Sequence, residues 1–394
     1  MKKLLLASAA AALFAGAAGA EEVKMGISLG FTGPLESLAG PMDKGAQLAM
    51  KEVSDSGKLL DGSTVTVVTG DSTCADAAAA TATVERLITA EGVRGIVGGM
   101  CSGETIASLE NVAKANGIVM ISPSATSPAL SDIEDNGLFF RTAPSDARQG
   151  EVMADILTGK GIMSVAVTYT NNDYGKGLAD SFQAAYEAKG GKVTVNAPHD
   201  DGKADYSAEV AALAAAGGDA LAVVGYIDQG GAGVTRAALD TGAFSTFIFP
   251  DGMVGTALEE KFGAETAGSI GINPASEGDG RDKFNEMAEA AGFDPHSPYA
   301  GEAYDAAALM LLAMQAAGSS DPAAYKDKIT EVANAPGEPI LPGELGKALE
   351  ILAGGGDIDY VGASSVEMVG NGESAGTFRE TEMKDGALAV IGFR

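Results

Sequence analysis

The sequence of 394 residues contains no tryptophan, only two histidines and only two cysteines. Most zinc and redox sites are built from histidine and cysteine, and neither His199 nor His296 has metal-ligand spacing to a partner. Both stand in loop-like segments, so we expect two surface histidines. The H-E-x-x-H and S-x-x-K motifs of hydrolases are also missing. These absences predict a protein that is not an enzyme and that uses no metal or cofactor.

No apolar run is long enough to cross a bilayer core of roughly 30 Å. The most apolar stretch, residues 4–15, follows Lys2 and Lys3 and precedes small residues that end at Ala20. This order is typical of a secretory signal peptide over residues 1–20, cleaved after Ala20. Because no cysteine lies near that position, no lipid anchor is expected. We predict a soluble protein that is exported to the periplasm.

Basic residues are scarce, with 26 lysines and arginines against 54 aspartates and glutamates. The formal net charge is −28 at pH 7, and it becomes −30 once Lys2 and Lys3 are removed. A chain of this charge is repelled by nucleic acids and by anionic membrane surfaces. Nucleic acid is therefore excluded as a partner. The acidity itself is typical of a solubility or salt adaptation, and an acidic docking patch is the alternative.

The two cysteines, Cys74 and Cys101, are an even count in a chain that carries an export signal. An oxidising compartment favours one structural disulfide over a metal or redox pair. In the chain-entropy model, a bridge closing a loop of this length contributes roughly 3 to 4 kcal/mol to stability.

Short apolar runs rich in β-branched residues alternate with alanine-rich segments of helical period, as in parallel βαβ units. One such series runs from Val23 to Ile121 and a second from Ala147 to Phe249. Three helical segments without strands then follow near 281–291, 299–317 and 322–333, and the tail from 357 contains short alternating runs typical of edge strands. A mature chain of this length exceeds one hydrophobic core, so we predict an α/β protein of two lobes.

Polar loops follow the predicted strands at the edge where open α/β sheets bind ligands. In the first series these are residues 31–35, 100–105 and 122–128, in which hydroxyls and free backbone N–H groups suit a carboxylate. In the second series they are 168–175, 225–226 and 250–252, with tyrosines and an aspartate. Ordinary turns, helix caps and surface aromatics are the alternative explanations.

In this order, the loops resemble those of the leucine/isoleucine/valine-binding proteins, the type I periplasmic receptors of branched-chain amino-acid ABC importers. The resemblance covers essentially the whole mature chain. The segments that carry it are Thr32-Gly33-Pro34-Leu35, Cys101-Ser102, Ile121-Ser122-Pro123-Ser124-Ala125-Thr126, Phe140-Arg141-Thr142-Ala143, Tyr174-Gly175-Lys176-Gly177 and Ser297-Pro298-Tyr299 with Tyr304. The cysteine pair matches as well.

The resemblance implies a Venus-flytrap clamp in which the chain crosses between two Rossmann-like lobes three times, near Ala143, Asn273 and Tyr360. Lobe one then comprises 21–143 plus 275–356, and lobe two comprises 144–274 plus 357–394. It also implies a monomer that binds a small molecule, an amino acid or an analogue, and delivers it to an inner-membrane ABC permease. Related clamps instead act as ligand sensors for a signalling partner, and the sequence alone does not separate the two roles.

Site residues follow from the same resemblance. Ser102 and Thr126 match carboxylate ligands, with backbone N–H groups around Ala125 assisting. The Ser124 carbonyl and Asp251 match acceptors for an α-ammonium.

Tyr174 and Tyr226 match aromatic walls of the family's site. Two positions at the side-chain end depart from the family pattern: Leu38 replaces a common aromatic, and Glu302 falls where an apolar ring is usual. A buried carboxylate there would favour a polar, amide-bearing or cationic ligand. Alternatively, Glu302 lies in the first turn of a helix and points to solvent.

Overall fold

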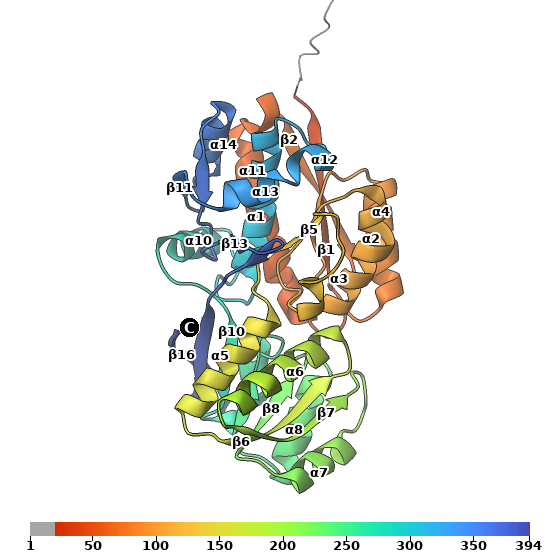
Figure 1. Cartoon of the computed structure of the whole chain (residues 1–394), viewed down its shortest axis with the longest axis vertical. Coiled ribbons are helices and arrows are strands. Elements are labelled where there is room, and N and C mark those ends of the chain that lie inside the picture. Colours follow the sequence, from red (N-terminus) through yellow and green to blue (C-terminus); the bar gives the residue numbers. More distant parts are fainter. Residues whose placement is uncertain (1–19) are drawn as a thin grey trace, which may run out of the picture.

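The computed structural model describes residues 20–394, so the predicted signal peptide lies outside the described residues except for Ala20. Two α/β lobes lie one above the other along the long axis of the molecule (Figure 1), each built on a seven-stranded sheet. The predicted fold class, two Rossmann-like lobes with parallel central sheets, is confirmed.

The first sheet has the order β13-β14-β5-β4-β3-β1-β2, and six of its strands, all but β13, are parallel. Its central strands are short and apolar, as expected for a sheet buried on both faces. The strands are β1 (Glu22–Leu29), β2 (Thr64–Asp71), β3 (Ile96–Gly98), β4 (Met120–Ser122), β5 (Phe139–Arg141), β13 (Met368–Val369) and β14 (Glu373–Ser374).

The second sheet repeats this plan, with the order β16-β15-β10-β9-β8-β6-β7. Strands β6 to β10 are parallel, and the antiparallel pair β15 and β16 extends the sheet beyond β10. The strands are β6 (Ser164–Thr170), β7 (Lys192–His199), β8 (Ala220–Val224), β9 (Phe247–Phe249), β10 (Ile270–Pro274), β15 (Phe378–Lys384) and β16 (Ala387–Phe393).

Helices cover both sheets. Those of the first lobe are α1 (Glu36–Ser56), α2 (Ala77–Thr89), α3 (Ser102–Ser108), α4 (Lys114–Asn116), α10 (Asp279–Ala290), α11 (Ala300–Ala317), α12 (Pro322–Tyr325), α13 (Lys328–Ala333) and α14 (Leu345–Ala353). Those of the second are α5 (Asp146–Gly159), α6 (Asp173–Ala188), α7 (Ser207–Ala216), α8 (Gly230–Thr241) and α9 (Thr256–Phe262). A two-stranded pair, β11 (Glu338–Ile340) and β12 (Ile358–Tyr360), lies beside α14.

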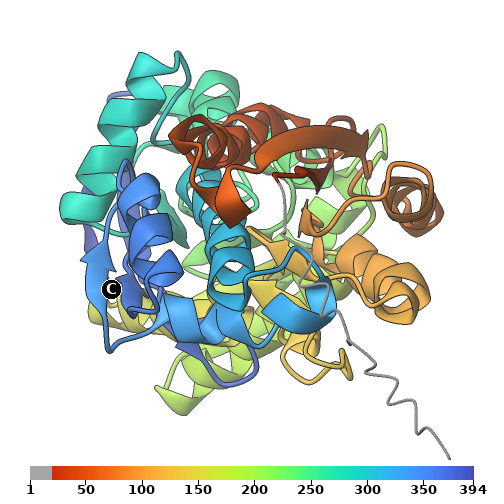
Figure 2. The same ribbon diagram turned by 90° about the horizontal axis from the view of Figure 1, so that it is seen from above.

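Helix α11 is the central helix of the first lobe and has buried residues on all of its faces. Seen from above, it passes through the middle of the lobe beside α1 (Figure 2). The two helices approach so closely that a Cβ atom at Gly45 would lie 2.2 Å from the carbonyl oxygen of Ala300. Glycine at this position therefore allows the contact that fixes the start of α11 near the cleft.

The chain crosses between the lobes after β5, after β10 and after β14, that is, within residues 142–145, 275–278 and 375–377. The third crossing differs from the expected one near Tyr360. Strand β12 pairs with β11, and β13 and β14 complete the first sheet beside β5. An ion pair of 2.6 Å between Arg141 and Glu373 fixes β14 there. Residues 357–374 thus pair with first-lobe strands, although the resemblance implied that they belong to the second lobe.

Candidate ligand-binding cleft

The loops predicted to carry the site meet between the lobes. In both sheets the parallel strands have the order 2-1-3-4-5, so the connections reverse direction between the first and third strands of each lobe. Ligands of open α/β sheets bind at this switch point. Hydrogen bonds join the facing loops: Ser127 Oγ donates to the Asp173 carbonyl at 3.0 Å, and the Ser37 N–H donates to Asp228 Oδ2 at 3.0 Å. The structure is therefore a closed clamp.

Three predicted hydroxyls lie in the first wall of the cleft, and all are buried. Ser102 is the first residue of α3, and its Oγ accepts from the N–H of Ser127 at 3.0 Å. Ser124 Oγ donates to the Met100 carbonyl at 2.7 Å, which connects the loops after β3 and β4. Thr126 Oγ1 donates to Asp146 Oδ2 at 2.9 Å.

Arg141 positions this wall. Its side chain is 1% exposed, and its Nη1 donates to the carbonyls of Ala125 and Ser127 at 3.1 and 2.9 Å. Because both carbonyls are held on the arginine, the loop after β4 keeps a fixed shape. Arg141 belonged to the segments that resembled the family, but no pattern around it indicated this positioning role.

The second wall is aromatic. Tyr174 and Tyr226 follow β6 and β8, and their rings stack with centroids 5.2 Å apart and an interplanar angle of 13°. Both are buried at 3% exposure, so the alternative of surface aromatics at loop tips is wrong. Asn172 donates to the Tyr226 hydroxyl at 3.4 Å.

Asp251 joins the two lobes. It follows β9, is 3% exposed, and accepts a hydrogen bond of 2.7 Å from the Tyr174 hydroxyl. Its other oxygen accepts from the hydroxyl of Tyr299, which belongs to the first lobe. Tyr299 adopts φ +66°, and this left-handed backbone immediately precedes α11. Tyr299 was part of a segment that resembled the family, but it was not among the predicted site residues.

A second carboxylate, Asp146, was missed by the sequence analysis. It is the first residue of α5, just after the first crossing, where an acidic residue is an ordinary helix start. It is fully buried, and within residues 20–394 its Oδ1 has no hydrogen-bond partner. Burial raises its pKa well above the usual range, and the nearby Asp251 carboxylate adds to the rise. Burial also raises the pKa of Asp251, against the lowering effect of its tyrosine partners.

The two departures from the family pattern are also buried. Leu38, on α1, is 3% exposed and lies close to the second lobe, where a Cβ added at Gly255 would lie 3.3 Å from its Cδ2. Glu302 is 1% exposed, so the alternative in which it points to solvent is wrong. Its Oε1 lies 3.8 Å from Arg281 Nη2, while burial raises its pKa and Arg281 lowers it. The Glu302 charge thus has a counter-ion within the protein.

The predicted disulfide between Cys74 and Cys101 is present and ends directly before Ser102. It ties the loop after β2 to the start of α3. Glu104, on the first turn of α3, accepts from the N–H groups of Met100 and Cys101 at 2.6 and 3.2 Å. Burial raises its pKa to about 7, although these hydrogen bonds oppose the rise.

The prediction of two surface histidines is half wrong. His296 is exposed, but His199 at the end of β7 is 2% exposed. Its Nδ1 lies 2.8 Å from Thr168 Oγ1, and burial lowers its pKa to about 4. Its neighbours in sequence are polar, and only the pairing of β7 with β6 places it under α8.

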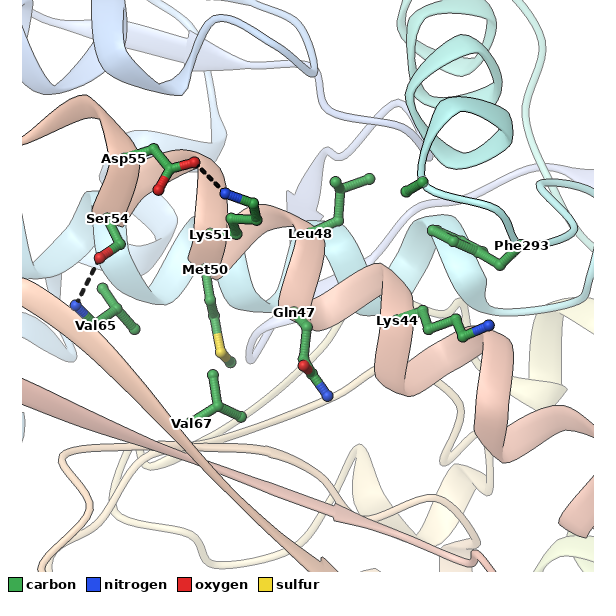
Figure 3. A pocket seen from close by; sticks show the side chains of 11 residues that line it. Lys44, Gln47, Leu48, Met50, Lys51, Ser54, Asp55, Val65, Val67 and Phe293 are labelled. Atoms are coloured by element: carbon green, nitrogen blue, oxygen red, sulfur yellow. Dashed lines mark hydrogen bonds and ion pairs between the residues drawn. The ribbon is translucent and has the colours of Figure 1, made fainter.

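A hollow of about 390 Å³ lies away from the cleft, between α1, β2 and Phe293 (Figure 3). Its lysine Lys51 pairs with Asp55, and Ser54 Oγ accepts from the N–H of Val65 at 3.1 Å. These contacts attach the outer end of α1 to the edge strand. None of the predicted site residues lines this hollow.

Within residues 20–394, no helix is long and apolar enough to cross a membrane. The same part of the chain contains no group of three or more histidine, cysteine or acidic side chains arranged to hold a metal ion.

Comparison with known proteins agrees with this geometry. The model of a periplasmic binding protein family matches residues 22–346. A Leu/Ile/Val-binding protein homologue of Brucella melitensis is 32% identical over 331 residues, covering 82% of this chain and 86% of the relative.

Solved structures show the same fold. A leucine-binding protein of Thermotoga maritima has a TM-score of 0.79 at 23% identity, covering 94% of this chain and 98% of the other. A solute-binding protein from Rhodopseudomonas palustris in complex with benzoate has a TM-score of 0.75 at 19% identity, covering 95% and 96%. The chain belongs to the periplasmic binding proteins and, within them, to the leucine/isoleucine/valine-binding protein family.

Proposed function

We propose that the protein captures an amino acid, or an analogue that retains the α-ammonium and α-carboxylate groups, in the cleft between its lobes. The observation that carries this proposal is that hydrogen-bond donors, which bind an anion, and carboxylates, which bind a cation, occupy different parts of the cleft. Hydroxyls and a helix start lie on the first wall, while Asp146 and Asp251 lie buried together beside the second. A zwitterion satisfies both, because a carboxylate needs donors and an ammonium needs acceptors.

On the first wall, the Ser102 hydroxyl and the backbone N–H of Thr126, next to Ala125, bind the carboxylate, while the Thr126 hydroxyl donates to Asp146. The start of α3 at Ser102 adds free N–H groups and the positive end of the helix dipole. Arg141 supports this wall by holding the carbonyls of Ala125 and Ser127. The Thr126 N–H belongs to the same peptide group as the Ala125 carbonyl and therefore remains oriented.

The ammonium is bound by Asp251, Asp146 and the Ser124 carbonyl. Two neighbouring carboxylates repel one another and raise each other's pKa, whereas a cation placed between them removes the repulsion. Tyr174 and Tyr226 form an aromatic wall against the ligand. Asp146 extends the site beyond the residues predicted from the sequence, and its unpartnered Oδ1 supports the assignment.

In the part of the cleft that faces the ligand side chain, Glu302 does not favour a cationic ligand in the way that its position in the sequence suggested. Since Arg281 balances its charge, Glu302 does not require a cationic ligand. Leu38 and the ring of Tyr299 give this end of the cleft apolar surface. An apolar or amide-bearing side chain therefore fits the charge distribution better than a cationic one.

We further propose that the protein is exported, with residues 1–20 removed, and acts as a monomer. In an ABC import system, it delivers its ligand to an inner-membrane permease. Curated relatives of this family carry the name Leu/Ile/Val-binding protein homologue, and their shared fold supports a binding role without catalysis. The benzoate complex of one structural neighbour means that the fold alone does not select an amino acid. The two carboxylates of this cleft do.

Matched ligands test the proposal. Leucine is compared with isocaproate, which lacks the ammonium, and with isoamylamine, which lacks the carboxylate; the same trio is built on other amino acids. A ligand at 100 times its Kd raises unfolding stability by about 2.7 kcal/mol, which thermal denaturation detects. Among the three ligands, we expect only the zwitterion to give stabilisation that Asp251→Asn abolishes. If isocaproate and the other ligands without an ammonium stabilise the protein, and Asp251→Asn abolishes that stabilisation, the proposal is contradicted.

A further inference from the structure

A separate hollow of about 240 Å³ lies at the hinge, on the other side of Tyr299 from Asp251. Its walls come from both lobes. The second crossing, α10 and the loop before α11 form one side, and β15 and β16 form the other. None of the predicted carboxylate or ammonium ligands lines it.

Two arginines from opposite lobes face this hollow. Arg281, on α10, is 12% exposed, and within residues 20–394 its one ionic contact is Glu302 at 3.8 Å, beyond hydrogen-bond distance. Arg379, on β15, donates to the Asn273 side chain at 3.3 and 3.4 Å and to the His296 carbonyl at 3.4 Å. All three bonds are long. Both guanidinium groups therefore keep unused capacity as donors.

Neither arginine has a close counter-ion. Within residues 20–394, Glu302 is the one acidic side chain that forms an ion pair with either of them, at 3.8 Å from Arg281, and its own burial disfavours the charged form. Burial lowers the pKa of Arg379, and repulsion from Arg281 lowers it further. Glu277 and Asp282 also line the hollow, but both are exposed at its rim, where water screens their charge. Asp294 and Glu259 oppose the lowering of the Arg379 pKa, but neither forms an ion pair with Arg379 in the described part of the chain.

The remaining wall is apolar. Val390 is 55% exposed and Phe393 is half-buried, and both border the hollow opposite α10. Pro298 closes the end nearest the cleft. The hollow thus offers one guanidinium from each lobe, with apolar side chains of β16 on the side of Arg379, which matches a carboxylate that bears a short hydrocarbon group.

We propose that this hollow is a second ligand site, which binds a small monocarboxylate between Arg281 and Arg379 with its hydrocarbon part against Val390 and Phe393. The bound carboxylate supplies the counter-ion that Glu302 cannot supply to both arginines. This site is independent of the cleft, because it uses neither Asp251 nor the hydroxyl wall.

Isobutyrate is the probe, titrated by calorimetry at low ionic strength against a sodium chloride control. We expect saturable binding to the wild type that Arg379→Gln weakens at least tenfold. Arg148→Gln is the matched control, since Arg148 is an exposed arginine on α5 that pairs with Glu151. Because Arg281→Gln leaves Glu302 without a counter-ion, Arg281→Gln is combined with Glu302→Gln, and this double variant should also lose isobutyrate binding.

Asp251→Asn separates the two sites. It should abolish amino-acid binding in the cleft and leave isobutyrate binding intact, so either proposal can fail alone. Absence of saturable binding, wild-type affinity in Arg379→Gln, or loss of binding in Asp251→Asn would each overturn the second site. Equal affinity for inorganic phosphate would overturn its assignment to a carboxylate with a hydrocarbon group.

Discussion

Asp251→Asn is the substitution that best tests the cleft, because it should separate binding from stability. The side chain keeps its size and can still accept a hydrogen bond from one of its tyrosine partners, but it loses its charge. If Asp251 pairs with a ligand ammonium in a closed, water-poor cleft, removing that charge should cost about 2 to 5 kcal/mol of binding free energy. At 1.4 kcal/mol per tenfold, Kd rises by about 30-fold to several thousand-fold.

Stability should respond differently. The folded pKa of Asp251 is raised by burial, so its ionised form is less favourable in the folded chain than in the unfolded one. Its contribution to stability is therefore present below the unfolded pKa and is lost as the pH rises through the folded pKa. Each unit of such a rise costs about 1.4 kcal/mol at neutral pH. Asparagine does not ionise, so Asp251→Asn avoids this loss of stability at neutral pH. This gain offsets the weaker hydrogen bonds that asparagine makes to the tyrosines.

The assay pairs calorimetry with chemical denaturation of the ligand-free protein at pH 7. For Asp251→Asn we expect lost affinity with little change in the free energy of unfolding. Asp305→Asn is the control: this aspartate is equally buried but lies outside the cleft and accepts bonds from Tyr360, Ala363 and Ser364. Burial raises the pKa of Asp305 as well, but Asp305 accepts four such bonds, so more of them are lost. Asp305→Asn should lose stability, by about 1 to 3 kcal/mol for each bond left unmade, and keep its affinity. Near-native affinity in Asp251→Asn refutes the pairing with an ammonium.

Three further predictions concern stability and motion. Replacing Cys74 and Cys101 by serine should lower the free energy of unfolding, measured by denaturation, by roughly 3 to 4 kcal/mol. An unchanged value would show that the disulfide does not stabilise the protein by closing a loop of the unfolded chain. The raised pKa of Glu104 predicts that the free energy of unfolding falls as the pH rises through about 7. The lowered pKa of His199 predicts that it also falls as the pH is lowered from about 6.5 to 4. Glu104→Gln should remove the pH dependence near 7 and leave the one between 6.5 and 4. Small-angle scattering should show a smaller radius of gyration with ligand bound, and an equal radius at saturation would contradict hinge closure.

The parallel sheets and the loops at their ends could be predicted because both depend on local patterns. Apolar runs and helical periods place each strand next to its helix, and all parallel strands of one sheet end at the same edge. For this reason Ser102, Thr126, Tyr174 and Asp251, which are far apart in sequence, could be assigned to one cleft. The structure brings all four to the facing edges of the two sheets.

The features that sequence analysis missed depend on contacts between distant segments. Strands β13 and β14 are too short to carry a pattern of their own, and they join the first sheet because β5 has a free edge and Arg141 needs a counter-ion. His199 looked exposed because its neighbours in sequence are polar, but strand pairing decides on which side of the sheet it lies.

Asp146 and Tyr299 show the same limit within the site. An aspartate at a helix start and an aromatic after a proline each have an ordinary local explanation. Their role becomes visible only when the crossing after β5 and the loop before α11 bring them to Asp251 from opposite sides. Tyr299 then divides the region near the hinge into two parts with opposite charge preference. The carboxylates in the cleft favour a cationic group, and the arginines in the hinge hollow favour an anionic one. The Tyr299 side chain lies between these two regions, so a single aromatic residue separates a site for a cation from a site for an anion.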